Sequence, residues 1–152
     1  MEPRLLREAP EFKESISDFL LQEWQKFEKD SSRVALEEYL TQGLNNSDET
    51  HTYFLNENKQ VTGAATLINK STQTHPEISP WVSGLYIKMA YKNWELAEVL
   101  LHRIEEHAKA LGHQTLYLTT YDQEKLFASL DWELISVQSL GKFECKIMTK
   151  SL

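Results

Sequence analysis

Residues Ser79–Thr120 read SPWVSGLYIKMAYKNWELAEVLLHRIEEHAKALGHQTLYLTT and contain two apolar runs separated by an amphipathic one. The first apolar run, Trp81–Ile87, is typical of a strand and breaks at a short polar loop. Helical periodicity follows over Trp94–Leu111, and a second apolar run occupies Thr115–Thr120. This order predicts a β-loop-α-β unit with a right-handed crossover and two roughly parallel strands.

The amphipathic run predicts a helix with one face against a sheet. Its apolar residues recur at i, i+3, i+4 and i+7 spacing, and they are Leu96, Ala97, Leu100, Leu101, Ile104, Ala108 and Leu111. Gly112 supplies a C-terminal stop. The first turn of such a helix presents backbone N–H groups without helical acceptors at the positive end of the helix dipole. The loop that enters the helix is therefore a candidate phosphate or pyrophosphate site.

In order and spacing, this segment resembles the central motif of the GNAT superfamily of acetyl-CoA-dependent N-acetyltransferases. The strand end GLYIKMAY (Gly84–Tyr91) leads into KNWELA (Lys92–Ala97), which stands where the family has its Arg/Gln-x-x-Gly-x-Gly/Ala loop. LYLTTYDQEKLFASLDWELI (Leu116–Ile135) resembles the family's next strand, its short Leu-Tyr-x-x-x-Gly-Phe/Trp helix and the strand after it. The resemblance covers the C-terminal half well and the N-terminal half in outline.

The remaining patterns agree with the fold that this resemblance implies. We expect a short strand at Leu5–Ala9, helices at 10–28 and 32–44, strands at Thr52–Leu55 and Val61–Ile68, and a terminal hairpin of Trp132–Leu140 and Lys142–Lys150. The resulting fold class is α/β with a mixed sheet, in the GNAT acyl-CoA N-acyltransferase order β-α-α-β-β-β-α-β-α-β-β. We expect one domain over residues 1–152.

The resemblance implies that acetyl-CoA binds as a co-substrate, largely through backbone amides. In the family, the strand before the loop holds the acetyl and pantetheine groups, which assigns Leu85, Tyr86 and Ile87 to this role. The loop would hold the pyrophosphate through Lys92, Asn93, Trp94, Glu95, Leu96 and Ala97. Thr120 takes the place of a frequent Asn and completes the expected cofactor site.

Asn93, Trp94 and Thr120 depart from the family pattern, and so do three further positions. Glu95 stands where the family has its central Gly, and a carboxylate there repels a pyrophosphate unless it points to solvent. Asp131 replaces another Gly. Phe127 replaces the Tyr that protonates the departing thiolate in many relatives, which leaves Tyr121 as the nearest phenol and the candidate general acid. Glu95 and Tyr121 also have structural interpretations, since Glu95 would favour the helix dipole and Tyr121 would stabilise a turn.

No general base can be assigned from the sequence. His75 and Glu77 lie upstream of the loop, where they either reach inward or remain solvated. The aromatic residues Trp24, Phe27 and Trp81 are candidates for an acceptor pocket, although such residues more often form core. We expect no metal site, because the histidines show no ligand spacing.

Composition limits the compartment and the partners. Cys145 is the only cysteine, which excludes an internal disulfide and favours a reducing cytoplasm. No run approaches the ~20 apolar residues that span a bilayer, and the N-terminus lacks the apolar core of a secretory signal. The formal charge of −7 disfavours nucleic acid and favours cationic partners such as amines. The terminal hairpin could pair with a second subunit in a homodimer.

Two functions remain open from the sequence. The first is a cytoplasmic N-acetyltransferase that transfers the acetyl group of acetyl-CoA to a primary amine of a small molecule or peptide, by direct attack in a ternary complex. The second is a catalytically silent GNAT-like domain that binds a ligand or a protein. The intact register of the loop favours the first function, whereas Glu95 and Phe127 favour the second.

Overall fold

A computed structural model describes residues 1–24, 37–38, 40–41, 49–69, 78–88, 94–140 and 143–152. Seven strands form one mixed sheet in the order β1-β2-β3-β4-β5-β7-β6. The strands are β1 (Arg4–Leu5), β2 (Thr50–Glu57), β3 (Gln60–Ile68), β4 (Trp81–Ile87), β5 (Thr115–Thr120), β6 (Glu133–Leu140) and β7 (Phe143–Ser151). All neighbouring pairs are antiparallel except β4 and β5, which are parallel as the sequence predicts.

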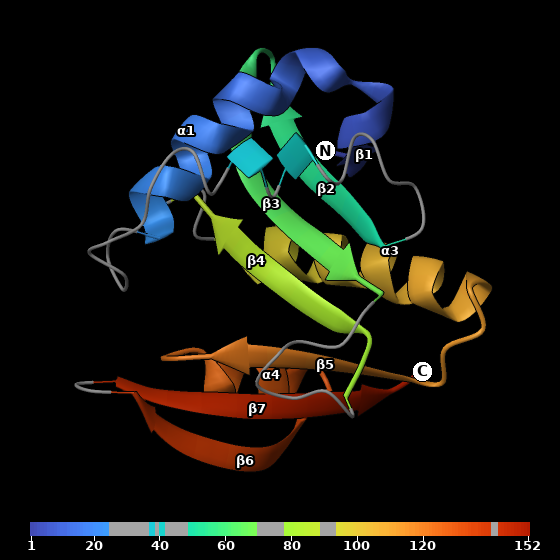
Figure 1. The fold of residues 1–152 in the computed structure, drawn as a ribbon, viewed down its shortest axis with the longest axis vertical. Coiled ribbons are helices and arrows are strands. Elements are labelled where there is room, and N and C mark those ends of the chain that lie inside the picture. Colours follow the sequence, from blue (N-terminus) through green and yellow to red (C-terminus); the bar gives the residue numbers. More distant parts are fainter. Residues whose placement is uncertain (25–36, 39, 42–48, 70–77, 89–93, 141–142) are drawn as a thin grey trace.

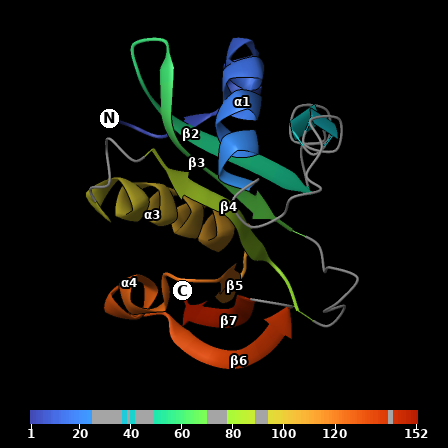
Figure 2. The same cartoon turned by 90° about the vertical axis from the view of Figure 1, so that its left-hand side faces the viewer.

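The helices lie on opposite faces of the sheet. Helix α1 (Lys13–Trp24) covers one face of the N-terminal half, and α3 (Trp94–Ala110) and α4 (Glu124–Ser129) lie on the other face (Figures 1 and 2). Each face has its own core. Ile16 and Leu20 of α1 pack on Phe54, whereas Leu100 and Ile104 of α3 pack among strand residues on the opposite side.

The predicted helix-and-strand unit is confirmed almost residue for residue. β4 and β5 have the expected bounds, and α3 ends one residue earlier than expected, at Ala110. Gly112 adopts a φ of 93°, which is a conformation that glycine reaches without strain. Its N–H donates to the carbonyl of Lys109 at 3.0 Å and helps to close the helix. Gly112 therefore follows the end of the helix, as the sequence predicts.

The N-terminal strand prediction is wrong in its extent. Only Arg4–Leu5 pairs with β2, and Leu6–Glu8 forms a 3-10 turn (η1). The buried Leu6 explains the turn, because its carbonyl accepts the N–H of Ala9 at 3.0 Å while its side chain enters the core below α1. A second 3-10 turn, η2 (Pro10–Phe12), then leads into α1. Of the helix expected at 32–44, residues 37–38 and 40–41 are helical, and the others lie outside the described residues.

Candidate functional site

Strands β4 and β5 run parallel for two residue pairs and then diverge. Trp81 lies opposite Tyr117 and Val82 opposite Leu118, and β4 continues to Ile87 beyond this pairing. Figure 1 shows the two strands separating toward their C-terminal ends. Leu85–Ile87 therefore belong to a strand whose β5 side is not engaged in the ladder, and backbone N–H and C=O groups there can bond an extended ligand.

A bulge in β4 accounts for the divergence. Ala64 of β3 lies opposite Tyr86 and Thr66 lies opposite Ser83, so that three steps along β4 match two steps along β3. The extra residue at positions 84–85 bends the strand and interrupts its pairing. The bulge also sets the side chains that follow, since Leu85 and Ile87 pack on the α3 side and Tyr86 on the α1 side.

Gly63 permits a close approach between β4 and α3. A methyl group at this position would lie 2.7 Å from Cδ1 of Ile87, 3.3 Å from Cδ1 of Leu100 and 3.3 Å from the carbonyl oxygen of Tyr86. The end of the divergent strand and the first half of α3 are thus packed together over a glycine. This packing fixes the start of α3 relative to the backbone of Leu85–Ile87.

The first turn of α3 begins at Trp94, and its N–H groups have no acceptor within the helix. Of the loop predicted to hold a pyrophosphate, Lys92 and Asn93 lie outside the described residues. Trp94 is 44% exposed and Glu95 is exposed, so neither side chain enters the core. Leu96 packs partly on the core, and Ala97 is buried, which explains the small residue at the last position of the motif.

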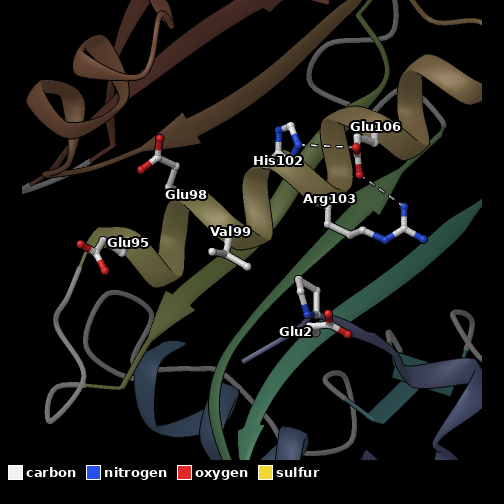
Figure 3. Close-up of a pocket in the computed structure, with 8 residues that line it drawn as sticks. Glu2, Glu95, Glu98, Val99, His102, Arg103 and Glu106 are labelled. Atoms are coloured by element: carbon white, nitrogen blue, oxygen red, sulfur yellow. Dashed lines mark ion pairs between the residues drawn. The ribbon is translucent and has the colours of Figure 1, made fainter.

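A groove of about 520 Å³ runs along the outer side of α3 (Figure 3). It lies between this helix and the N-terminal residues, and it is lined by Glu2, Pro3, Glu95, Glu98, Val99, His102, Arg103 and Glu106. The side chain of Glu106 is within 3.5 Å of His102 and 4.0 Å of Arg103. With four carboxylates and one guanidinium, the groove carries negative charge at neutral pH. It disfavours phosphate groups at the end where Glu95 lies.

The predicted catalytic region follows β5. Thr120 is buried, and its Oγ1 accepts the N–H of Gln123 at 3.0 Å, which ties the end of β5 to the start of α4. Tyr121 is partly buried at this junction. Phe127 lies in the core, edge-on to Trp132 with ring centroids 6.3 Å apart. The residue that replaces the family's Tyr is thus a packing residue.

The other candidates are placed in structural roles or lie outside the described residues. Trp81 is buried, and its Nε1 donates to the carbonyl of Ile78 at 2.9 Å, so it packs instead of lining a pocket. His75, Glu77 and Phe27 lie outside the described residues, as does the side chain of Trp24. Within the described ranges, no three histidine, cysteine or acidic side chains are placed to hold a metal.

Cys145 lies in β7 and is buried. Burial raises the pKa of its thiol, and a hydrogen bond with Thr119 opposes this only in part. A thiol with a raised pKa is a poor nucleophile at neutral pH. In this position Cys145 is a packing residue of the sheet.

One polar cluster beneath α3 could not be predicted from the sequence. Tyr53 and His51 of β2 lie against His107 of α3, with the Tyr53 hydroxyl 2.6 Å from Nδ1 of His107. His51 and Tyr53 are two residues apart and so share one face of a strand. This spacing is the only sequence signal for the cluster, and it does not identify His107 as the partner on α3.

A sequence model described as "Acetyltransferase (GNAT) family" matches residues 13–128. Comparison with curated proteins finds no match. Among solved structures, an aminoglycoside 6'-N-acetyltransferase complexed with coenzyme A is 16% identical with a TM-score of 0.77, over 99% of this chain and 97% of that one. The aminoglycoside 6'-N-acetyltransferase from Enterococcus faecium is 17% identical with a TM-score of 0.76 and the same coverage.

A ribosomal-protein-alanine N-acetyltransferase from Brucella melitensis is also similar over the full length of both chains, with 17% identity and a TM-score of 0.73. At these identities the likeness concerns the fold. In the described ranges, no helix is long and apolar enough to cross a membrane.

Proposed function

Since the chain belongs to the GNAT acetyltransferase family, we propose that it transfers the acetyl group of acetyl-CoA to a primary amine of a small molecule or peptide. The observation that carries the proposal is the divergence of β4 from β5 beside the start of α3. It leaves backbone groups of one strand open next to the N-terminus of a helix. This combination suits a ligand with an amide-rich arm and a pyrophosphate.

The backbone would make the main contacts with the cofactor. Within Leu85, Tyr86 and Ile87, the backbone groups that point away from β3 would bond the pantetheine arm and polarise the thioester carbonyl. The first turn of α3, with Lys92 and Asn93 before it, would hold the pyrophosphate. Thr120 would contribute indirectly, because its hydroxyl fixes the junction that follows β5.

The amine would attack the thioester carbon directly in a ternary complex. Its nitrogen forms the new amide bond, the carbon–sulfur bond breaks, and the coenzyme A thiolate leaves and takes up a proton. Tyr121 is our candidate donor of that proton, because it lies at the end of β5 and Phe127 has no hydroxyl. The amine gives up its proton to solvent as the amide bond forms.

Two proteins of similar fold are named for amine acceptors, an aminoglycoside and the alanine of a ribosomal protein. Together with the net charge of −7, this supports a cationic amine as the acceptor. Long-range attraction between an acidic protein and a cation raises the association rate at low ionic strength.

Calorimetric titration with acetyl-CoA tests the cofactor, and a thiol-release assay over a panel of primary amines tests the transfer. Saturable micromolar binding with amine-dependent thiol release supports the proposal. If acetyl-CoA binds but no amine causes thiol release, the result favours the second candidate, a catalytically silent ligand-binding module. The core position of Phe127 supports this candidate. If acetyl-CoA does not bind at millimolar concentration, the proposed transfer reaction and the proposed cofactor site both fail. A protein partner would then be the ligand to test.

We further propose a cytoplasmic homodimer. The single cysteine is buried and forms no disulfide within the chain, which suits a reducing compartment. β6 is an edge strand with three exposed aliphatic side chains, Leu134, Ile135 and Val137, each more than 40% exposed. Glu133 is the only charged residue in this strand, so it lacks the row of charges that usually keeps an edge from pairing.

A further inference from the structure

The polar cluster between α3 and β2 has the chemistry of a pH-sensitive contact. Tyr53 is 2% exposed and His51 is 5% exposed, so both rings are removed from water. His107 lies over them, with its ring centroid 4.3 Å from that of His51 and 5.8 Å from that of Tyr53. Two imidazoles and a phenol thus share one part-buried contact between a helix and a strand.

The protonation states of the hydrogen-bonded pair follow from their surroundings. Burial raises the pKa of Tyr53, with a further increase from Glu8, while Arg103 and Arg7 oppose it. Burial lowers the pKa of His107, and the positive charges of Arg103 and Arg7 lower it further. At neutral pH the phenol therefore keeps its proton and the imidazole is neutral, and in the tautomer that is protonated at Nε2 the phenol donates to Nδ1.

Uptake of a proton by His107 would reverse this arrangement. Nδ1 would become a donor, and the buried Tyr53 hydroxyl would lose its acceptor. The new imidazolium would also face Arg103, whose guanidinium lies 5.2 Å from the centre of the Tyr53 ring, and the second imidazole of His51. In the described part of the chain, Arg7 and Glu8 of η1 are the remaining charges that act on the pair.

The helix dipole favours the charged form of His107, but it does not outweigh the effects that disfavour this form. His107 lies in the last turn of α3, where the helix dipole favours a cation. Burial and two nearby guanidinium groups act in the other direction, and among the described residues Glu8 is the only acidic group that acts here, through Tyr53. The charged form of His107 is therefore disfavoured in the folded protein.

We propose that the Tyr53–His107 hydrogen bond, backed by His51, is a pH-sensitive latch that fastens α3 to β2 and is weakened when His107 takes up a proton. The latch lies toward the C-terminal end of the helix whose first turn belongs to the proposed cofactor site. It does not depend on that function, and its test uses the protein without cofactor.

The sign of the effect follows from linkage. Folded His107 binds a proton more weakly than unfolded His107, whose ordinary pKa is 6.5. The stabilisation is therefore complete above pH 6.5 and is lost progressively as the pH falls below it. One such proton changes the unfolding equilibrium constant by up to about tenfold per pH unit in that range.

The test combines a titration with a denaturation series. An NMR titration of the histidine rings in the intact chain should show His107 titrating below 6.5, and Tyr53→Phe should move its titration toward 6.5. Urea unfolding from pH 8 to pH 5 should show a loss of stability below pH 6.5 that is reduced in His107→Gln. His102→Gln is the matched control, since His102 lies on the exposed side of the same helix and pairs with Glu106.

The expected control result is a pH dependence like that of the unaltered protein. Titration of His107 at or above 6.5, or an unchanged pH dependence in His107→Gln, would overturn the latch. If His107→Gln does not fold, the NMR titration of the unaltered chain and of Tyr53→Phe decides the question. Neither measurement involves acetyl-CoA, so failure of the latch is distinguishable from failure of the proposed transferase activity.

Discussion

Glu95 has two opposing roles at the start of α3. In the free protein its carboxylate stabilises the positive end of the helix dipole, and in a complex it would repel the pyrophosphate. Because the side chain is exposed, both effects are screened by solvent. A single substitution should therefore change stability and cofactor affinity in opposite directions.

For Glu95→Gln we expect acetyl-CoA affinity to rise by about two- to fivefold and the free energy of unfolding to fall by about 0.3–1 kcal/mol. Calorimetry and urea unfolding measure the two quantities. Glu106→Gln, at the far end of the same groove, is the matched control and should change affinity less. An affinity that is unchanged or weaker in Glu95→Gln would show that this carboxylate does not oppose the cofactor.

Gly63 is the second residue for which the structure makes a sharp prediction. In Gly63→Ala the new methyl group would contact Ile87, Leu100 and the carbonyl of Tyr86 at 2.7–3.3 Å. We expect the substitution to cost about 1–3 kcal/mol of unfolding free energy through overpacking, and to weaken acetyl-CoA binding by displacing the β4 backbone.

Gly63→Ala combined with Ile87→Val should recover part of the lost stability, because the shorter side chain vacates the closest contact. Thermal unfolding and calorimetry of the single and double variants check this. Additive losses in the double variant would indicate that the methyl group does not meet Ile87.

At the scale of elements, some parts of this fold are determined by local sequence. The bounds of β4, α3 and β5 were predictable because each has a strong hydrophobic period and a clear stop, such as Gly112. The turn between β2 and β3 was also predictable, and Asn58 there adopts a φ of 55°. Turn residues of this kind act locally, so their effect can be read from the sequence.

The features that shape the site depend on contacts between distant segments. The bulge of β4 exists only in relation to its register with β3, and Gly84 at that point of the strand is the one local residue that is typical of a bulge. Likewise, Tyr53 and His107 are 54 residues apart in the chain. A ligand site made of backbone groups could therefore be predicted from the motif, whereas the contact between Tyr53 and His107 could not.

The edge strand β6 carries the prediction of a dimer. We expect the protein to dimerise at micromolar concentration and Val137→Lys to shift it to monomer, because a lysine at an edge opposes pairing with a second copy. Light scattering after size exclusion measures the mass. Leu111→Lys is the matched control, since Leu111 is equally exposed but lies after α3. A protein that remains monomeric at high concentration would contradict the dimer.

At the scale of the whole molecule, the seven-stranded sheet consists of two halves. Between β4 and β5 only two residue pairs are aligned, and α3 packs across the strands on both sides of this junction. The N-terminal half has a helix on each face, whereas α4 and the C-terminal strands form the other half (Figure 2).

Hydrogen exchange should reveal this division. In the free protein we expect amides of Leu85–Ile87 that face β5 to exchange faster than those of β3, because the ladder does not protect them. Saturating acetyl-CoA should slow them by at least tenfold if the strand bonds the cofactor. If acetyl-CoA leaves the exchange rates of these β4 amides unchanged, the cofactor does not bind along this strand.

The two-pair junction between β4 and β5 also bears on how the fold would come apart. Sheets usually fray from their outer strands, but here a line of only two residue pairs lies near the middle, as short as the pairing of the edge strand β1 with β2. A ligand lodged in that line would bond to strands on both sides of it, so binding would join two partly independent halves into one cooperative unit. We therefore expect substrate supply to set not only the turnover of this protein but also the sharpness of its unfolding transition.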